Sequence, residues 1–194
     1  MPRMMSSSRK PKMDSSQRRA RGSLDSRQQH AGMTGAGIQL DIGCGKEKQP
    51  GYVGMDRRAL PGVDVVHDWN VYPWPFPDES VLRVVASHVV EHVSPIDGNF
   101  IRWMDEIWRI CKPDAQLAIV TPHGLSVGYM ADPTHCNPCN EVTWCYFDPL
   151  DPRDAYKHYR PKPWAIRMLT WSPEANIEVL LMKRRDDKSY HEPV

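Results

Sequence analysis

Short apolar runs separated by turn residues begin at residue 38 and predict four β-strands. The runs cover residues 38–42, 52–55, 63–66 and 81–86, and they are rich in Val and Ile. Runs of four to eight such residues bounded by turn formers are typical of strands. Because the runs are nearly continuous in apolar character, they favour a sheet that is covered on both faces.

A longer period marks one helix further along the chain. From Phe100 to Cys111, large apolar side chains recur at offsets 0, 4, 7, 8 and 11 and draw one stripe along a helical face. A Lys-Pro pair ends this helix, and residues 116–121 follow as a fifth strand. Residues 166–171 and 177–182 flank a turn-rich segment and predict an antiparallel hairpin. These elements describe an open α/β sheet, in which ligands bind at the carboxyl ends of the strands.

The first 34 residues have a different composition. They contain one Leu and no Ile, Val or aromatic residue, so they cannot bury enough apolar surface to offset chain entropy. We therefore predict a disordered tail over residues 1–34 and one folded domain over residues 35–194. The tail holds eight Lys or Arg against two acids, which leaves a net charge of −5 on the remainder of a chain whose total is +1. A basic tail allows contact with a polyanion, whereas the acidic domain has the wrong sign for binding phosphate backbones.

Targeting signals are weak in this sequence. It has neither the apolar run of a secretory signal nor about 18 consecutive apolar residues for a membrane span. The Arg- and Ser-rich N-terminal segment is similar in composition to a transit peptide, but it has too few apolar residues to form the apolar face of an amphipathic helix. Five cysteines, an odd number, fit reduced thiols better than a disulfide framework. We expect a cytoplasmic protein with no membrane partner.

The segment LDIGCGKEKQPGYVGMD, residues 40–56, carries the strongest binding signal. Gly43 and Gly45 permit positive φ and close ligand approach, and Asp56 ends the next strand, where a carboxylate can accept ribose hydroxyls. The six residues between the glycines and the second strand cannot form the helix that would hold a pyrophosphate. The pattern favours a nucleoside ligand without that group. Taken singly, each of these residues is also common in ordinary turns.

Five motifs follow one another in order over about residues 38–122: DIGCG, GYVGMD, VVHDWN, PWPFPDESVLRVVASHVVEH and EIWRICKPDAQLAIVTP. This series resembles the class I S-adenosylmethionine-dependent methyltransferases, specifically the small type 11 group with a shortened first crossover. The resemblance implies an α/β, Rossmann-like, mostly parallel open sheet with a C-terminal antiparallel hairpin. It also implies S-adenosyl-L-methionine as the cofactor and makes residues 35–194 a methyltransferase-like domain. One departure is Asp114-Ala115, where the family usually has two glycines.

The resemblance assigns site residues by position. Residues of the glycine loop face the methionine end of the cofactor, Asp56 holds the ribose and Asp68 lies against the adenine. Ser87 and His88, which end the fourth strand, line the reactive centre. His88 is the catalytic or substrate-contacting candidate. The cofactor-binding set is Asp41, Gly43, Cys44, Gly45, Asp56, Asp68, Trp69 and Ser87.

A sulfonium cofactor carries its own reactivity, so the protein has to bind it, aim the methyl group and exclude water. A base is needed only if the acceptor must lose a proton, and His88, Glu91 and His92 are the candidates. In a helix, these three side chains would share a face at offsets 0, 3 and 4. They also have the ligand types of a zinc site, but the resemblance explains the motif without metal, so none is assigned. Capping and packing roles for Glu91 and His92 stay open.

Three later segments have two interpretations each. His123 and His135 are either acceptor-side residues or polar groups of a loop. The spacing of His135, Cys136, Cys139 and Cys145 begins like a zinc site, but no second ligand pair completes it. Residues 69–77 are either a ligand-facing wall or ordinary packing. The proline-rich stretch 148–164 is interpreted as an irregular insertion.

The leading hypothesis is methyl transfer to an unidentified acceptor. The sequence lacks an Asn-Pro-Pro-Tyr motif of base methylation, so a small-molecule or glycan hydroxyl is favoured over a nucleobase. The alternative is a non-catalytic cofactor-binding or interaction protein whose basic tail binds a polyanion. A zinc-stabilised module is the third hypothesis.

Overall fold

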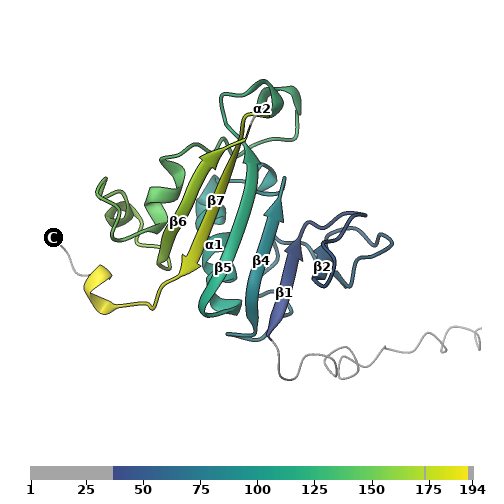
Figure 1. Cartoon of the computed structure of the whole chain (residues 1–194), viewed down its shortest axis with the longest axis horizontal. Coiled ribbons are helices and arrows are strands. Elements are labelled where there is room, and N and C mark those ends of the chain that lie inside the picture. Colours follow the sequence, from purple (N-terminus) through teal and green to yellow (C-terminus); the bar gives the residue numbers. More distant parts are fainter. Residues whose placement is uncertain (1–36, 173, 192–194) are drawn as a thin grey trace, which may run out of the picture. The chain divides into compact units, whose positions relative to one another are not determined.

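Seven strands form one mixed sheet in the computed structural model, which describes residues 37–172 and 174–191 (Figure 1). The order across the sheet is β3-β2-β1-β4-β5-β7-β6. The predicted tail, residues 1–34, lies outside the described residues. The strands are β1 (Ile38–Ile42), β2 (Val53–Asp56), β3 (Val65–Val66), β4 (Val81–Ser87), β5 (Cys111–Pro122), β6 (Trp164–Trp171) and β7 (Asn176–Lys183).

The pairing confirms a mostly parallel sheet with an antiparallel hairpin at its C-terminal edge. Strands β1 to β5 pair in parallel with their neighbours, whereas β7 runs antiparallel to both β5 and β6. Val179 of the central hairpin strand faces Ile119 on one side and Leu169 on the other. The ten residues between β1 and β2 contain no helix, which confirms the shortened first crossover.

The predicted helix is α1 (Asn99–Ile110), which connects β4 to β5. Its buried face includes Phe100, Met104 and Ile107 of the predicted stripe, together with Trp103. Cys111 belongs to β5 rather than to the helix, because its backbone is extended and it pairs with β4. The strand therefore starts before the Lys-Pro pair, and the proline favours extended backbone at Lys112, which precedes it.

The other helical segments are short and lie mainly in the connections. The 3-10 turns are η2 (Val90–His92), η3 (Ile96–Gly98), η4 (Thr143–Phe147), η5 (Tyr156–His158) and η6 (Lys188–His191). The second α-helix is α2 (Val127–Ala131), which Ser126 caps by accepting a hydrogen bond from the Tyr129 N–H. None of the described helices is long and apolar enough to cross a bilayer.

Only one face of the sheet is fully buried among the described residues. Leu117, Ile119, Val179 and Leu181 lie on the core face, and each is at most 1% exposed. The opposite face is half-exposed along the row Val85, Ala118, Leu180 and Met168. Within residues 37–172 and 174–191, the expectation of a sheet covered on both faces is therefore wrong. Apolar runs report the composition of a strand, but they do not ensure that another element covers its second face.

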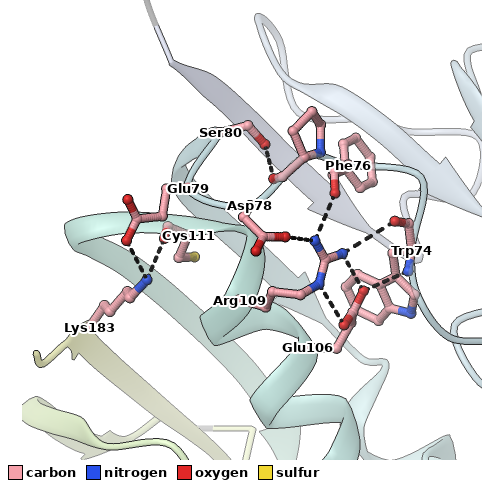
Figure 2. A network of polar contacts seen from close by, with 10 residues as sticks. Trp74, Phe76, Asp78, Glu79, Ser80, Glu106, Arg109, Cys111 and Lys183 are labelled. Atoms are coloured by element: carbon pink, nitrogen blue, oxygen red, sulfur yellow. Dashed lines mark hydrogen bonds and ion pairs between the residues drawn. The ribbon is translucent and has the colours of Figure 1, made fainter. Parts of the chain in front are cut away.

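A largely buried ion pair within α1, between Glu106 and Arg109, also binds the loop that follows β3 (Figure 2). Glu106 accepts hydrogen bonds from Arg109 and, at 2.6 Å, from the Trp74 N–H. Arg109 also binds Asp78 and donates to the carbonyl oxygens of Trp74 and Phe76. The Trp74 ring packs edge-on against Trp103 of α1 with 6.1 Å between centroids. These contacts fix the aromatic loop that begins at Trp69, in which Trp74 and Phe76 are buried and serve as packing.

Candidate functional site

A cavity of about 410 Å³ opens at the carboxyl ends of β1, β2 and β4. This is the sheet edge at which the topology places ligands in open α/β folds. Four of the nine predicted site residues line it, namely Gly43, Asp56, Trp69 and His88. The remaining lining residues are Arg57, Arg58, Val89, His92 and Thr134.

The glycine loop after β1 has the backbone that the sequence predicted. Gly43 has a φ of +66°, and a Cβ at this position would lie 2.4 Å from Cγ2 of Val89. Gly43 therefore needs glycine both for its conformation and for the space beside Val89. Gly45 has a φ of +56°, but a Cβ added there would meet nothing within 4 Å, so only its conformation favours glycine.

Asp56 sits at the end of β2 and connects the glycine loop to the cavity. Its Oδ2 accepts a hydrogen bond from the Gly45 N–H at 3.0 Å, and its Oδ1 accepts one from the Arg58 N–H at 2.9 Å and one from Arg58 Nε at 3.3 Å. Burial favours the protonated form, but the hydrogen bonds from Arg58 and Gly45 outweigh it and lower the pKa of Asp56. A carboxylate has about four acceptor sites, so three donors leave capacity for a ligand hydroxyl.

Asp41 and Cys44 support the loop without lining the cavity. Asp41 is buried, and its Oδ2 accepts a hydrogen bond from the Gln49 N–H at 2.8 Å. Burial raises the pKa of Asp41, while the Gln49 hydrogen bond and the Lys48 charge oppose the shift. The Cys44 sulfur fills the space above Gly54, where a Cβ would lie 2.6 Å away. Burial and the nearby carboxylates raise the pKa of Cys44 to about 11.

Asp68 and Ser87 flank the cavity residues but are not among them. Asp68 is exposed, and its Oδ1 accepts hydrogen bonds from both the N–H and the side-chain amide of Asn70, which builds a turn. Its neighbour Trp69 is the residue that lines the cavity, beneath the Arg57 guanidinium at 5.6 Å. Trp69 Nε1 is buried and has no hydrogen-bond partner. Ser87 ends β4 in an exposed position and pairs through its backbone with Val120.

His88 follows β4 in a left-handed backbone conformation, with a φ of 54°. Its N–H donates to the Val120 carbonyl at 2.8 Å, and its Nδ1 lies 3.3 Å from Glu91 Oε1. The contact with Glu91 raises the pKa of His88, while partial burial opposes the shift. The expected shared helix for His88, Glu91 and His92 is wrong, because η2 includes only the last two and His88 still follows the strand. His88 and Glu91 meet nevertheless.

The loop after α2 brings His135 beside η2 at this edge of the sheet. Glu91, His92 and His135 bring their potential ligand atoms within 4.8 Å of one another. His123 lies elsewhere, with its ring stacked on Trp171 at 4.3 Å between centroids. Among the described residues, which include every cysteine, no cysteine joins a cluster of potential metal ligands. The zinc-like spacing that begins at His135 therefore does not form a site of its own.

Four further lining residues were not predicted from the sequence, namely Arg57, Arg58, Val89 and Thr134. The two arginines directly follow Asp56, which ends β2. Their place beside the cavity could therefore have been predicted from the position of Asp56. No sequence signal indicated that Thr134 would lie 3.2 Å from His92 Nδ1, across 42 residues of chain.

The fold is similar to solved methyltransferase structures. A SAM-dependent methyltransferase from Archaeoglobus fulgidus aligns with a TM-score of 0.55 and 17% identity, over 81% of this chain and 90% of that one. A methyltransferase in complex with the Trm112 activator of Haloferax volcanii aligns with a TM-score of 0.55 and 11% identity, over 83% and 89% of the two chains. A SAM-dependent methyltransferase from Methanosarcina mazei gives 0.50 and 16%, over 75% and 92%.

No protein-family model matches the sequence, and no curated protein is significantly similar to it. At these identities the structural likeness shows the fold. It confirms the Rossmann-like methyltransferase fold that the sequence resemblance implied, including the C-terminal antiparallel hairpin.

Proposed function

We propose that this chain is an S-adenosylmethionine-dependent methyltransferase whose cofactor occupies the cavity at the ends of β1, β2 and β4. The observation that carries the proposal is the pairing of Gly43 and Asp56 on one cavity wall. Gly43 presents bare backbone where a Cβ would collide with Val89, and Asp56 keeps acceptor capacity at the end of the neighbouring strand. The likeness of the fold to SAM-dependent methyltransferases supports the same cofactor.

The residues present fit a sulfonium nucleoside. The cavity of about 410 Å³ falls within the usual range of small-molecule sites, roughly 300–1,000 Å³. Asp56 would accept a ribose hydroxyl, Gly43 would let the cofactor approach the backbone, and Trp69 offers an aromatic wall with an unpartnered Nε1. Asp41, Cys44 and Gly45 would act by holding the loop, while Asp68 and Ser87 would flank the bound group.

His88 is the proposed base for an acceptor hydroxyl. When bound, the cofactor supplies an activated methyl group. The Glu91 carboxylate faces His88 Nδ1 and favours a proton there, which leaves Nε2 free to accept one. Held beside Gly43 and Asp56, the cofactor would supply the methyl group, while Nε2 of His88 would accept the proton that the acceptor hydroxyl gives up.

The acceptor class is a further part of the proposal. A small molecule or a glycan with a hydroxyl group fits a site that opens beside His88. The alternative of a non-catalytic protein with a polyanion-binding tail rests on residues 1–34, and no observation in the described residues favours it.

Titration calorimetry tests the cofactor assignment. The full chain should bind S-adenosylmethionine and S-adenosylhomocysteine, and Asp56→Ala should weaken both. Asp64→Asn is the control, because Asp64 is an exposed carboxylate at the amino end of β3 that does not line the cavity. Absence of binding by the wild-type chain contradicts the proposal. Cell extract incubated with the protein and labelled cofactor would then reveal the acceptor as a mass gain of one methyl group.

A further inference from the structure

Glu91, His92 and His135 form a cluster at one end of the proposed cofactor cavity. Each offers one potential ligand atom, and these atoms all lie within 4.8 Å of one another. The rings of His92 and His135 meet edge to face with centroids 4.8 Å apart. His92 and its neighbour Thr134 line the cavity, so the cluster borders that space.

The hydrogen bonds around His92 leave one of its nitrogens available. Thr134 Oγ1 donates its single hydrogen to Asp132 Oδ1 at 2.7 Å, because an ionised carboxylate only accepts. The same hydroxyl oxygen lies 3.2 Å from His92 Nδ1 and must therefore accept the proton that Nδ1 carries. In that tautomer Nε2 of His92 keeps its lone pair.

His135 reaches the same state through a different partner. Its Nδ1 lies 2.9 Å from the backbone carbonyl oxygen of Tyr129, which can only accept, so Nδ1 carries the proton. Nε2 of His135 keeps its lone pair, and Asp132 Oδ2 adds negative charge 3.8 Å away. Metal-binding histidines almost always donate their second ring N–H to a carbonyl, a carboxylate or a similar acceptor.

Glu91 supplies the charge that a cation needs. The residue is 1% exposed, and its Oε2 accepts a hydrogen bond from Thr121 Oγ1 at 3.0 Å. Its Oε1 is buried without a hydrogen-bond partner and faces His88 Nδ1 at 3.3 Å. Because a carboxylate has about four acceptor sites, these two neighbours leave room for a metal ion.

The two segments that carry the cluster are held together by backbone bonds rather than by the cluster itself. The Glu91 carbonyl accepts hydrogen bonds from the N–H groups of Cys136 at 2.8 Å and Asn137 at 3.1 Å. The Asn137 side chain also donates to the Val90 carbonyl at 3.1 Å. The site is thus organised before any metal binds.

We propose that Glu91, His92 and His135 bind a divalent transition-metal ion, with Zn²⁺ as the best match to the donor set. Two histidines and one glutamate are a typical ligand set of zinc sites that keep a fourth, open position. Here the open position would face the cavity. This role rests on the proposed function: the ion would bind the hydroxyl oxygen of the methyl acceptor at the open position and favour transfer of the hydroxyl proton to His88.

Zinc binding by the full chain tests the site without any assay of activity. After removal of metal with a chelator, the protein should bind one Zn²⁺ in competition with a chromophoric chelator. Substitution with Co²⁺ should give the visible absorption bands of a nitrogen- and oxygen-ligated ion. His135→Ala should abolish both signals, whereas the exposed His158→Ala should change neither.

Two gentler variants keep the test decisive if His135→Ala fails to fold by circular dichroism. Thr134→Val removes only the partner of His92 and should weaken Zn²⁺ binding by roughly 10- to 100-fold. Cys136→Ser removes an exposed thiol beside the cluster and should leave binding unchanged. The proposal is overturned if the wild-type chain does not bind Zn²⁺, if Thr134→Val binds as tightly as wild type, or if Cys136→Ser abolishes binding.

Calorimetry with S-adenosylmethionine on the metal-free protein separates this site from the proposed function. If the cofactor binds but Zn²⁺ does not, the metal site is wrong and the methyltransferase assignment stands. If Zn²⁺ binds with the expected variant pattern but the cofactor does not, the metal site stands and the assignment fails.

Discussion

The Asp56 carboxylate accepts a hydrogen bond from the Gly45 N–H at 3.0 Å, so the end of β2 holds the loop that follows β1. The same carboxylate lines the cavity. One side chain therefore sets the shape of the glycine loop and offers acceptor sites to a ligand. A substitution there should affect the loop and the cofactor together.

Asp56→Ala should lower the affinity for S-adenosylmethionine by roughly 10- to 100-fold, because hydrogen bonds to charged groups contribute about 1.5–3 kcal/mol. Calorimetry of Asp56→Ala beside Asp56→Asn separates two contributions. The asparagine keeps an acceptor for the Gly45 N–H but not the negative charge, so it should fall between wild type and alanine. Equal affinity in all three proteins would remove Asp56 from the cofactor site.

Gly43→Ala should be more destabilising than Gly45→Ala. Both residues have positive φ, which costs a residue with a side chain roughly 1–2 kcal/mol. Only at Gly43 does the new Cβ also collide, with Cγ2 of Val89 at 2.4 Å. Urea denaturation of double variants should show that adding Val89→Ala restores part of the stability lost in Gly43→Ala, but none of the stability lost in Gly45→Ala. Equal destabilisation by the two alanines would contradict this packing.

The sequence patterns predicted those elements in which buried residues recur at a regular spacing along the chain. The strand over residues 38–42 has the same bounds in the structure, and the hairpin strands differ by two residues or fewer at each end. The helix could be predicted because its apolar residues recur at a helical period. Three of them, Phe100, Met104 and Ile107, face the core in the structure. Such patterns show which side of an element is apolar. They therefore predict the type of each element and its order along the chain.

The rest of the site depends on contacts between segments that are distant in the chain. His88 was expected in a helix, but its N–H pairs with Val120 of β5, and no spacing around His88 indicates that partner. The contact between His92 and Thr134 likewise requires the loop after α2 to fold back over η2. Motif resemblance found Gly43 and Asp56 because both lie at strand ends, where topology alone brings them together.

Glu106→Gln should destabilise the fold by roughly 1.5–3 kcal/mol, the range for hydrogen bonds to charged groups, because Arg109 then keeps only the exposed Asp78 as a charged partner. The amide keeps an acceptor for the Trp74 N–H, so the loss reports the charge rather than that hydrogen bond. Asp154→Asn is the matched control, since both Asp154 and its partner Lys157 are about half-exposed and their ion pair should contribute less than about 1 kcal/mol. Similar unfolding free energies for the two variants would contradict the role given to Glu106.

Cys136 should be the cysteine that reacts fastest with iodoacetamide in the native protein. It is exposed, whereas the other four cysteines are buried. Burial raises the pKa of both Cys111 and Cys139 to about 12, which keeps these thiols protonated and unreactive near neutral pH. Mass spectrometry after brief labelling should find the modification at residue 136, and Cys136→Ser should abolish the fast phase. Rapid labelling of Cys139 instead would show that its loop opens readily.

Lys183 should make the fold more stable as the solution becomes alkaline. Its ammonium is buried and donates to the Cys111 carbonyl at 2.7 Å (Figure 2). It also lies 3.7 Å from the centroid of the Trp108 ring. Burial lowers the pKa of Lys183 below its ordinary value of 10.5, although Glu79 and Asp78 oppose the shift. The unfolded chain therefore binds more protons in the window below pH 10.5, and the free energy of unfolding contributed by this lysine rises with pH there.

Urea denaturation of wild type and Lys183→Met from neutral pH to about pH 10 measures this contribution, because methionine retains the apolar stem but does not titrate. The stability of wild type relative to Lys183→Met should increase steadily over that range. Lys157→Met, which removes a half-exposed ammonium, shows whether loss of any lysine gives the same slope. A wild-type advantage that shrinks with rising pH would mean that the folded protein holds the Lys183 proton more tightly than the unfolded chain, against the burial argument.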